Sequence, residues 1–190
     1  MSIYNCHKQQ PQPWMSYISR NKIVFPGECC PALVTGNRCD VISTEVEYGY
    51  LYNWYAATDV RNICSEGWHV PIKADFDVIR TFLGEGDYWE GSDDAEKLRE
   101  TGITHWISPN SLATNEYKFN ARGSGNRQTA ISPQFQFLRE RLYIWNLTPM
   151  PGYPTNGMVV PMFYNSIYWY NSPYTGVEKN NGCSIRLVKD

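Results

Sequence analysis

The helical periodicity of this chain ends near residue 102, and this limit constrains its fold more than any other feature. Before that point, two segments carry apolar residues at the three- and four-residue spacing of an amphipathic helix. Beyond it, short runs rich in Tyr, Trp, Ile and Val alternate with clusters of Pro, Gly, Asn and Ser, which is typical of strands joined by long loops. Two helices followed by irregular β structure predict an α+β domain.

Both helices have sequence signals at their ends. The first is expected to start near Pro71, because the first turn of a helix does not use the N–H that proline lacks. It is expected to stop at Gly84, and its apolar positions are Ile72, Phe76, Ile79, Phe82 and Leu83. Asp93 as N-cap and Glu96 three residues later predict a capping box for the second helix. Gly102 is the residue type that commonly ends a helix in the left-handed conformation.

Length and charge exclude several classes of protein. The chain has 190 residues, which suits one domain with its own hydrophobic core. Its formal net charge is −2, whereas binding to nucleic acid or to an anionic membrane needs a basic excess. No apolar run approaches the roughly 18 residues of a membrane span. Residues 1–8 lack a basic start followed by an apolar stretch, so we expect no signal peptide.

Residues 1–45 differ in composition from residues 46–190, which predicts an N-terminal segment followed by the main domain. The run 8–13, rich in Pro and Gln, favours an extended polyproline-like backbone. The run 23–25, which precedes a Pro-Gly pair, predicts a short strand. The segment has two interpretations: an arm for attachment, or an N-terminal strand that completes the main sheet.

The cysteines allow several interpretations. They lie at positions 6, 29, 30, 39, 64 and 183, a spacing that fits no CxxC metal pattern. Those before residue 40, with His7, would suit a zinc site only poorly, because adjacent cysteines do not readily serve one tetrahedral ion. Buried thiols or one or two disulfides are the alternatives. Without a secretion signal, reduced thiols are expected at synthesis.

Several motifs between residues 46 and 190 occur together in one known family. The run 48–57 (YGYLYNWYAA) is followed by 63–71 (ICSEGWHVP) and by 97–102 (KLRETG) with Trp106. The runs 108–110 (SPN) and 113–116 (ATNE) follow, then Gly125 with Arg127, and the chain ends in 182–190 (GCSIRLVKD). In this order the motifs resemble the Fibrobacter succinogenes major paralogous domain family.

The resemblance implies a C-type-lectin-like fold with two helices, an irregular antiparallel β-sheet and long loops, related to the fold of formylglycine-generating enzymes. Family members occur on bacterial surfaces, and similar domains are the variable ligand-binding proteins of phage retroelements. The family usually has a cysteine where Leu187 stands, and the nearest cysteine here is Cys183. These two positions share one face of a strand. The resemblance therefore implies a disulfide between Cys64 and Cys183 as one alternative.

We expect no catalytic site, metal or cofactor. His69 and His105 adjoin tryptophans, so we interpret each as a buried histidine with one hydrogen bond, and Cys64 has no identifiable partner cysteine for catalysis. The acidic stretch 85–94 lacks the spacing of an EF-hand and is interpreted as a solvated loop. The triplet 108–110 lacks the acidic residue with which calcium-dependent lectins bind sugars.

The candidate binding residues lie in the segment 163–182. It is rich in Tyr, Asn and Ser, which is the composition of antibody-like binding surfaces. In an extended run, alternate side chains share a face, which turns Ile167 and Trp169 to the core. The residues expected to contact a ligand are Tyr164, Ser166, Tyr168, Tyr170, Asn171, Ser172 and Tyr174. The alternative is a β-rich domain that is rich in Tyr and Asn for no functional reason.

These observations predict a non-enzymatic recognition protein, a phage virion surface component such as a fibre or a receptor-binding decoration. Its expected ligand is a host-surface glycan or protein. Residues 1–45 are expected to contact other virion proteins, and a homo-oligomer is expected, trimers being common among fibres. The alternatives are a bacterial cell-surface adhesin and a purely structural capsid or tail component.

Overall fold

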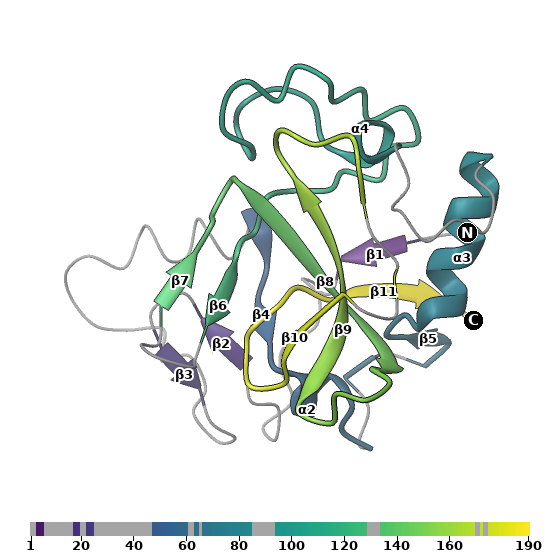
Figure 1. Cartoon of the computed structure of the whole chain (residues 1–190), viewed down its shortest axis with the longest axis vertical. Helices are drawn as coiled ribbons and strands as arrows, with labels where there is room; N and C mark the ends of the chain where they lie inside the picture. The colour runs from purple at the N-terminus through teal and green to yellow at the C-terminus, as the bar shows by residue number, and fades with distance from the viewer. Residues whose placement is uncertain are drawn as a thin grey trace.

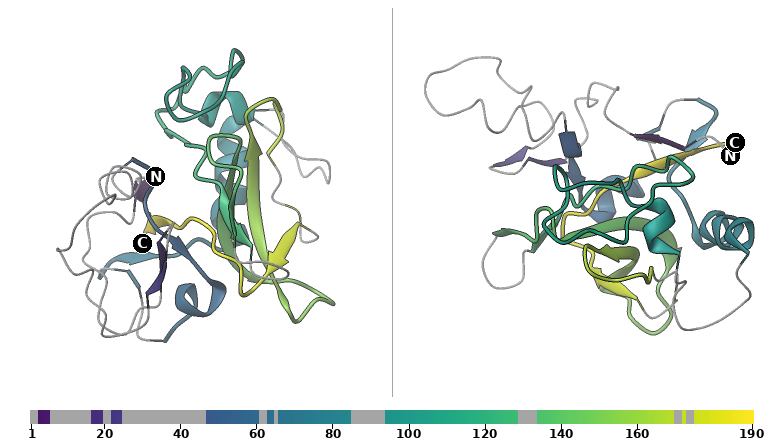
Figure 2. Two further views of the ribbon diagram at one scale, coloured as in Figure 1. Left: turned by 90° about the vertical axis from the view of Figure 1, so that its left-hand side faces the viewer. Right: turned by 90° about the horizontal axis from the view of Figure 1, so that it is seen from above.

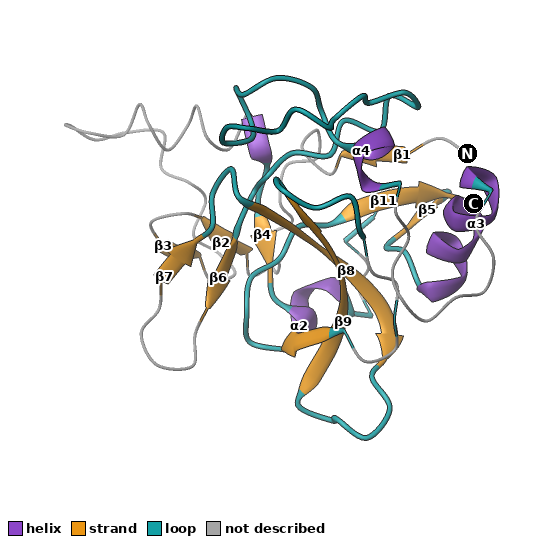
Figure 3. Ribbon diagram, turned by 45° about the horizontal axis from the view of Figure 1, so that its top comes forward, coloured by secondary structure: helices purple, strands orange, loops and turns teal. Residues whose placement is uncertain are grey.

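The computed structural model describes residues 3–5, 17–19, 22–24, 47–60, 63–64, 66–84, 94–128, 134–169, 172 and 175–190, the first three ranges by their backbone only. These ranges form an α+β structure with few helices, several small antiparallel sheets and long loops (Figures 1 and 3). The expected α+β class is thereby confirmed. None of the helices in these ranges is long and apolar enough to cross a membrane.

The described helices are α2 (Trp54–Ala57), α3 (Lys73–Leu83) and α4 (Ala95–Leu98). The first strands are β1 (Ile3–Asn5), β2 (Tyr17–Ser19), β3 (Lys22–Val24), β4 (Leu51–Tyr52) and β5 (Trp68–His69). They are followed by β6 (Asn126–Gln128), β7 (Gln134–Gln136), β8 (Arg141–Pro149), β9 (Asn156–Phe163), β10 (Gly176–Glu178) and β11 (Arg186–Lys189). In the sheets the strand orders are β1-β11-β5, β10-β9-β8, β3-β2-β4 and β6-β7.

The two longest strands, β8 and β9, form an antiparallel hairpin at the centre of the domain (Figure 1). Successive side chains of a strand point to opposite faces. Trp145 and Val159 therefore belong to one hydrophobic cluster, whereas their neighbours Ile144 and Val160 belong to a second. All four side chains are at most 1% exposed, so the hairpin is buried on both faces.

The two clusters use different parts of the chain. The first cluster joins the hairpin to α2 and β11 through Tyr52, Trp54, Ala56, Ala57, Ile63, Val70, Trp145, Val159, Cys183, Ile185 and Leu187. The second cluster joins it to α3 and α4 through Phe76, Leu83, Ala95, Leu98, Trp106, Phe119, Ala121, Leu142, Ile144, Val160, Met162 and Trp169. The indole N–H of Trp145 donates to the Tyr52 carbonyl at 2.6 Å, and that of Trp106 to the Ala121 carbonyl at 2.8 Å. Both buried indoles are thus satisfied.

Strands near the N-terminus pair with strands of the main domain. β1 pairs with β11, with Ile3 opposite Val188, so the two termini lie close together (Figure 2, right). β2 pairs with β3 and with β4. β3 contains the first two residues of the strand predicted at 23–25. This pairing agrees with the interpretation of an N-terminal strand that completes the sheet, and a role of residues 1–45 in attachment stays a prediction.

The first predicted helix is confirmed as α3. It begins just after Pro71 and turns Phe76 and Leu83 into the core. At its end Gly84 has φ +89°, the left-handed conformation in which glycine is least strained. Its N–H donates to the carbonyls of Arg80 and Thr81, which ends the helix there.

The second predicted helix is wrong in its length. α4 ends at Leu98, and Arg99 is already extended with φ −72° and ψ 139°. The physical reason is a tertiary contact: Glu100 N–H donates to the Ala121 carbonyl, and Ala121 N–H to the Leu98 carbonyl, both at 3.0 Å. The backbone therefore pairs with a distant loop instead of continuing the helix. Asp94 forms no capping hydrogen bond, and the predicted cap at position 93 lies outside the described residues.

The position of the hairpin predicts the effect of two matched substitutions. Val160→Ala removes two methyl groups from a fully buried site, and we expect it to lower the free energy of unfolding by about 2 kcal/mol. Val60→Ala, at a side chain that is 99% exposed, should change it by less than about 0.5 kcal/mol. Urea unfolding measures the free energy of unfolding of both variants. Equal losses in the two variants would contradict the burial of the hairpin on both faces.

Candidate binding surface

The segment after β9 forms a turn, and the extended run expected there is wrong. β9 ends at Phe163, and residues 164–165 form a turn in which Ser166 N–H donates to the Phe163 carbonyl at 3.3 Å. Tyr168 N–H then donates to Ser166 Oγ at 3.1 Å. A turn breaks the two-residue alternation of a strand. Tyr164 consequently packs partly against the second cluster and does not share one solvent face with the following tyrosine.

The predicted binding residues differ in their exposure. Tyr168 is 43% exposed, and it is the only exposed member of the predicted set among the described residues. Tyr164, Ser166 and Ser172 are half-buried. Three others, Tyr170, Asn171 and Tyr174, lie outside the described residues. The part of the predicted surface that the structure describes is therefore the loop around Tyr168.

A buried arginine holds this loop in place. The Arg99 guanidinium, which is fully buried, donates through Nη1 to the carbonyls of Phe163 and Ser166. Ala95 N–H also donates to the Ile167 carbonyl at 2.8 Å. Burial lowers the pKa of Arg99, and the charge of Glu96 partly opposes this shift. The short helix α4 thus positions the backbone of residues 163–167.

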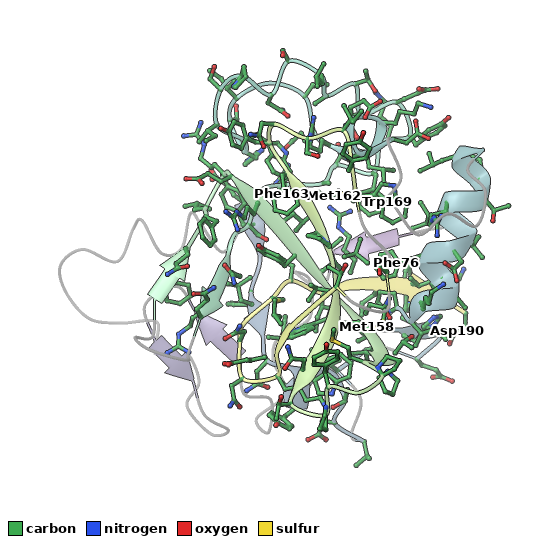
Figure 4. All side chains as sticks on the ribbon, viewed as in Figure 1. Phe76, Met158, Met162, Phe163, Trp169 and Asp190 are labelled. Carbon is green, nitrogen blue, oxygen red and sulfur yellow. The ribbon has the colours of Figure 1, made fainter. Side chains whose placement is uncertain are left out.

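Trp169 fixes the other end of the loop. As predicted, its side chain faces the core and is 1% exposed. Its ring lies 6.3 Å from that of Phe76 on α3, and its backbone forms a bridge with Met162 (Figure 4). The exposed side chain of Tyr168 therefore lies directly beside a buried anchor.

An apolar hollow on a neighbouring surface was not expected from the sequence. It has a volume of about 310 Å³ and lies between α3, α4 and the loop 117–119. Its wall includes Leu83 and Leu98, and the ring of Phe82, which is 67% exposed, meets Tyr117 edge-on at 5.0 Å. The sequence nevertheless contained a signal for this hollow. Val78 and Phe82 are four residues apart and so adjacent on the surface of the helix, on a different face from Phe76 and Leu83.

His69 is not the buried histidine that we expected. Its side chain is 39% exposed and lies between two carboxylates, with Nδ1 2.6 Å from Asp190 Oδ1 and Nε2 3.2 Å from Asp75 Oδ2. Asp75 also accepts the Ile72 N–H at 2.8 Å. Burial opposes protonation of the ring, but the hydrogen bonds and charges of the two carboxylates outweigh it and raise the pKa of His69 above 6.5. The cluster joins β5, α3 and the C-terminal residue, and Figure 4 shows Asp190 beside α3.

This geometry predicts a pH dependence of stability. Because the pKa of His69 is higher in the folded protein, the folded state binds the proton more tightly, and the cluster stabilises the fold fully below about pH 6.5. The contribution should disappear as the pH rises through the raised pKa. Thermal unfolding between about pH 5.5 and 8.5 should show a fall in Tm for the wild type that His69→Gln largely lacks. Identical pH profiles of Tm for the wild type and His69→Gln would contradict a stabilising role of the protonated His69.

His105 matches its expectation more closely. Its side chain is 11% exposed, and Nδ1 lies 2.5 Å from Glu100 Oε2. Arg122 donates to the same carboxylate through Nε at 3.0 Å and Nη2 at 3.2 Å. Asn110 is buried and donates to the carbonyls of Glu100 and Gly102 at 2.9 and 2.8 Å. The asparagine of the triplet 108–110 therefore stabilises the loop that follows α4 by binding the backbone of residues 100 and 102.

The structure has Cys64 and Cys183 as thiols, not as the disulfide that the resemblance implies. Cys183 precedes β11 and is held in a bridge with Tyr52, whose N–H donates to the Cys183 carbonyl at 2.8 Å. This places its side chain in the first cluster, against which Cys64 also packs. Burial raises the pKa of the Cys183 thiol. The other cysteines lie outside the described residues.

In the described ranges, no three His, Cys, Asp or Glu side chains are grouped so that they could hold a metal ion. Asp94, the last residue of the acidic stretch 85–94, pairs with Lys97 at 2.5 Å. The remaining acidic residues of that stretch lie outside the described residues. The hypothesis of a calcium site in that stretch gains no support from Asp94, because a lysine already neutralises it.

The structure is thus an α+β domain in which a turn, anchored at both ends, displays an exposed tyrosine. A family model, the Fibrobacter succinogenes major domain, matches residues 33–189. The chain belongs to this family, which confirms the resemblance of its motifs. No curated protein and no solved structure matches it significantly.

Proposed function

We propose that this chain is a non-enzymatic recognition protein of C-type-lectin-like fold, which binds a host-surface glycan or protein through the loop that carries Tyr168. We further propose that it is a phage virion surface component, with residues 1–45 as a contact to other virion proteins and with assembly as a homo-oligomer. The observation that carries the proposal is the fixed display of Tyr168 between two anchors.

The anchors support recognition for an energetic reason. A loop that is ordered before binding loses less conformational entropy when the ligand arrives. The carbonyls of Phe163 and Ser166 are held by Arg99, and Trp169 is buried against Phe76. Tyrosine contributes a large rigid contact area and a polar hydroxyl, which is why it is enriched in binding surfaces. Tyr168 is thus well placed as an energetic centre of an interface.

The state of the reactive side chains supports a function without catalysis. A cysteine nucleophile needs a lowered pKa, whereas burial raises the pKa of Cys183. Both ring nitrogens of His69 are engaged by carboxylates, and His105 is engaged by Glu100. These contacts give the side chains a role in holding elements of the fold together.

The arrangement of the strands supports the proposed C-type-lectin-like fold. The terminal strands β1 and β11 pair with each other, and long loops connect short strands on the remaining surface. A fold of this kind separates a rigid core from a surface that tolerates changes of sequence. The loop at Tyr168 would belong to that surface.

A matched pair of substitutions tests the proposal. Tyr168→Ala removes the exposed ring, and we expect binding to an array of bacterial surface glycans or to immobilised host cells to fall at least about tenfold, the effect of losing one binding hot spot. Tyr153→Ala is the control, because Tyr153 is 53% exposed but lies at the opposite end of the β8–β9 hairpin.

Both variants should keep the Tm of the wild type, since each alters an exposed side chain. Binding that is unchanged in Tyr168→Ala, or reduced equally in both variants, would refute the proposed recognition surface. A fall in Tm confined to Tyr168→Ala would assign the residue to folding instead.

A further inference from the structure

A polar recess lies away from the loop of Tyr168, where residues 47–52, the loop 122–124 and the start of β11 meet (β4 and β11 in Figure 1). Its volume is about 20 Å³, roughly the space of one or two water molecules. The lining residues that matter here are Glu47, Tyr50, Arg122, Ser124, Ser184 and Arg186. The full lining has two arginines, one glutamate and five residues with hydroxyl groups, whereas apolar and aromatic side chains line the hollow beside α3.

Arg186 enters the recess as a cation without a carboxylate partner in the described part of the chain. Its Nη1 donates to the Phe119 carbonyl at 2.6 Å and its Nη2 to the Asn120 carbonyl at 2.7 Å. Its guanidinium also stacks on the Phe119 ring, 4.5 Å from the centroid. A guanidinium has five N–H groups, so these two bonds leave donors available. Burial, with a smaller effect of the nearby Arg122 charge, lowers the pKa of Arg186 to about 10, so it remains a cation at neutral pH.

The Glu100 carboxylate favours the charged form of Arg186, but the charge of Arg122 opposes it more strongly, so the neighbouring charges do not compensate that of Arg186. Arg122 is neutralised by Glu100, to which it donates two hydrogen bonds, and its Nη1 donates to the Glu47 carbonyl at 2.7 Å. His105 contacts Glu100 as well. The Glu47 residue is exposed, so water screens any repulsion between its carboxylate and an incoming anion. Arg186 is half-buried, so its guanidinium loses part of its hydration, and an anion in the recess would offset that loss.

The recess also contains two serine hydroxyls that hydrogen-bond each other, and when Ser124 donates in that bond the Ser184 O–H can donate to an anion. Ser124 Oγ and Ser184 Oγ lie 2.7 Å apart, and both residues are buried. Arginine is the side chain best suited to a carboxylate, because its planar fork can donate two parallel hydrogen bonds. The hydrogen bonds to the Phe119 and Asn120 carbonyls and the stacking on the Phe119 ring already fix the orientation of the Arg186 guanidinium. Ligand binding would therefore cost little side-chain entropy.

We propose that this recess binds one carboxylate group of a small ligand, with Arg186 as the principal contact and the serine hydroxyls beside it. A recess of about 20 Å³ is too small for a sugar ring, so only the carboxylate group would reach Arg186 and the remainder of the ligand would lie outside. The site is separate from the surface around Tyr168, and either proposal can fail without the other.

A titration of the full chain tests the site with three probes. Glucuronate offers a sugar carboxylate, acetylglycine offers a carboxylate of the peptide type, and glucose is the neutral match of glucuronate. In ¹⁵N-labelled protein, the Arg186 Nε–H signal and the Ser184 amide signal should shift saturably with a carboxylate probe and stay unchanged with glucose. A response to glucuronate alone identifies the sugar as the source, and a response to both acids identifies the carboxylate as sufficient.

Absence of a shift with both acids, or an equal shift with glucose, would overturn the proposal. Arg186→Lys keeps the charge but loses the planar fork, and we expect glucuronate affinity to fall at least about tenfold. Arg141→Lys is the matched control, because Arg141 also stacks on a phenylalanine, 3.7 Å from the Phe137 centroid, but does not line the recess. Equal affinities of the two variants would also overturn the proposal, and if Arg186→Lys does not fold, the wild-type titration decides it.

Discussion

The β8–β9 hairpin is buried on both faces, and its two sides organise the packing of the whole domain. Neighbouring residues such as Trp145 and Ile144 lie in different clusters, so each half of the domain must pack against the same two strands. The packing on one side is tight: a Cβ at Gly157 would lie 2.2 Å from the Trp54 ring. The positions of α2, α3 and β11 all follow from contact with this hairpin.

The same constraint explains how a loop can be held rigidly outside the sheet. The turn after β9 begins where the hairpin ends, and its carbonyls have no strand partner. Arg99 supplies the donors from the opposite side, and Trp169 returns to the second cluster. A side chain between these contacts, Tyr168, is left exposed. The candidate surface is therefore a consequence of how the core closes around the hairpin.

Local signals predicted well where local interactions decide the structure. Pro71 and Gly84 marked the ends of α3 because helix capping depends on adjacent residues. Trp169 also points inward as expected, although the strand alternation on which that expectation depended does not continue after Phe163. By contrast, the expected second helix ended early because the backbone after Leu98 pairs with Ala121, more than twenty residues away. The expected alternation after Phe163 failed because the bonds from Arg99 favour a turn.

The family, the α+β class, the helix α3 and the aromatic character of the segment 163–182 were predictable from the residues alone, because each depends on residue type or on spacing along the chain. Three features could not be predicted in this way: which tyrosine is exposed, the position of His69 between Asp75 and Asp190, and the place of Arg186 in a polar recess, hydrogen-bonded to backbone carbonyls. These features arise from contacts between residues far apart in the chain. Their free energies depend on burial and on distance, neither of which the order of the residues specifies directly.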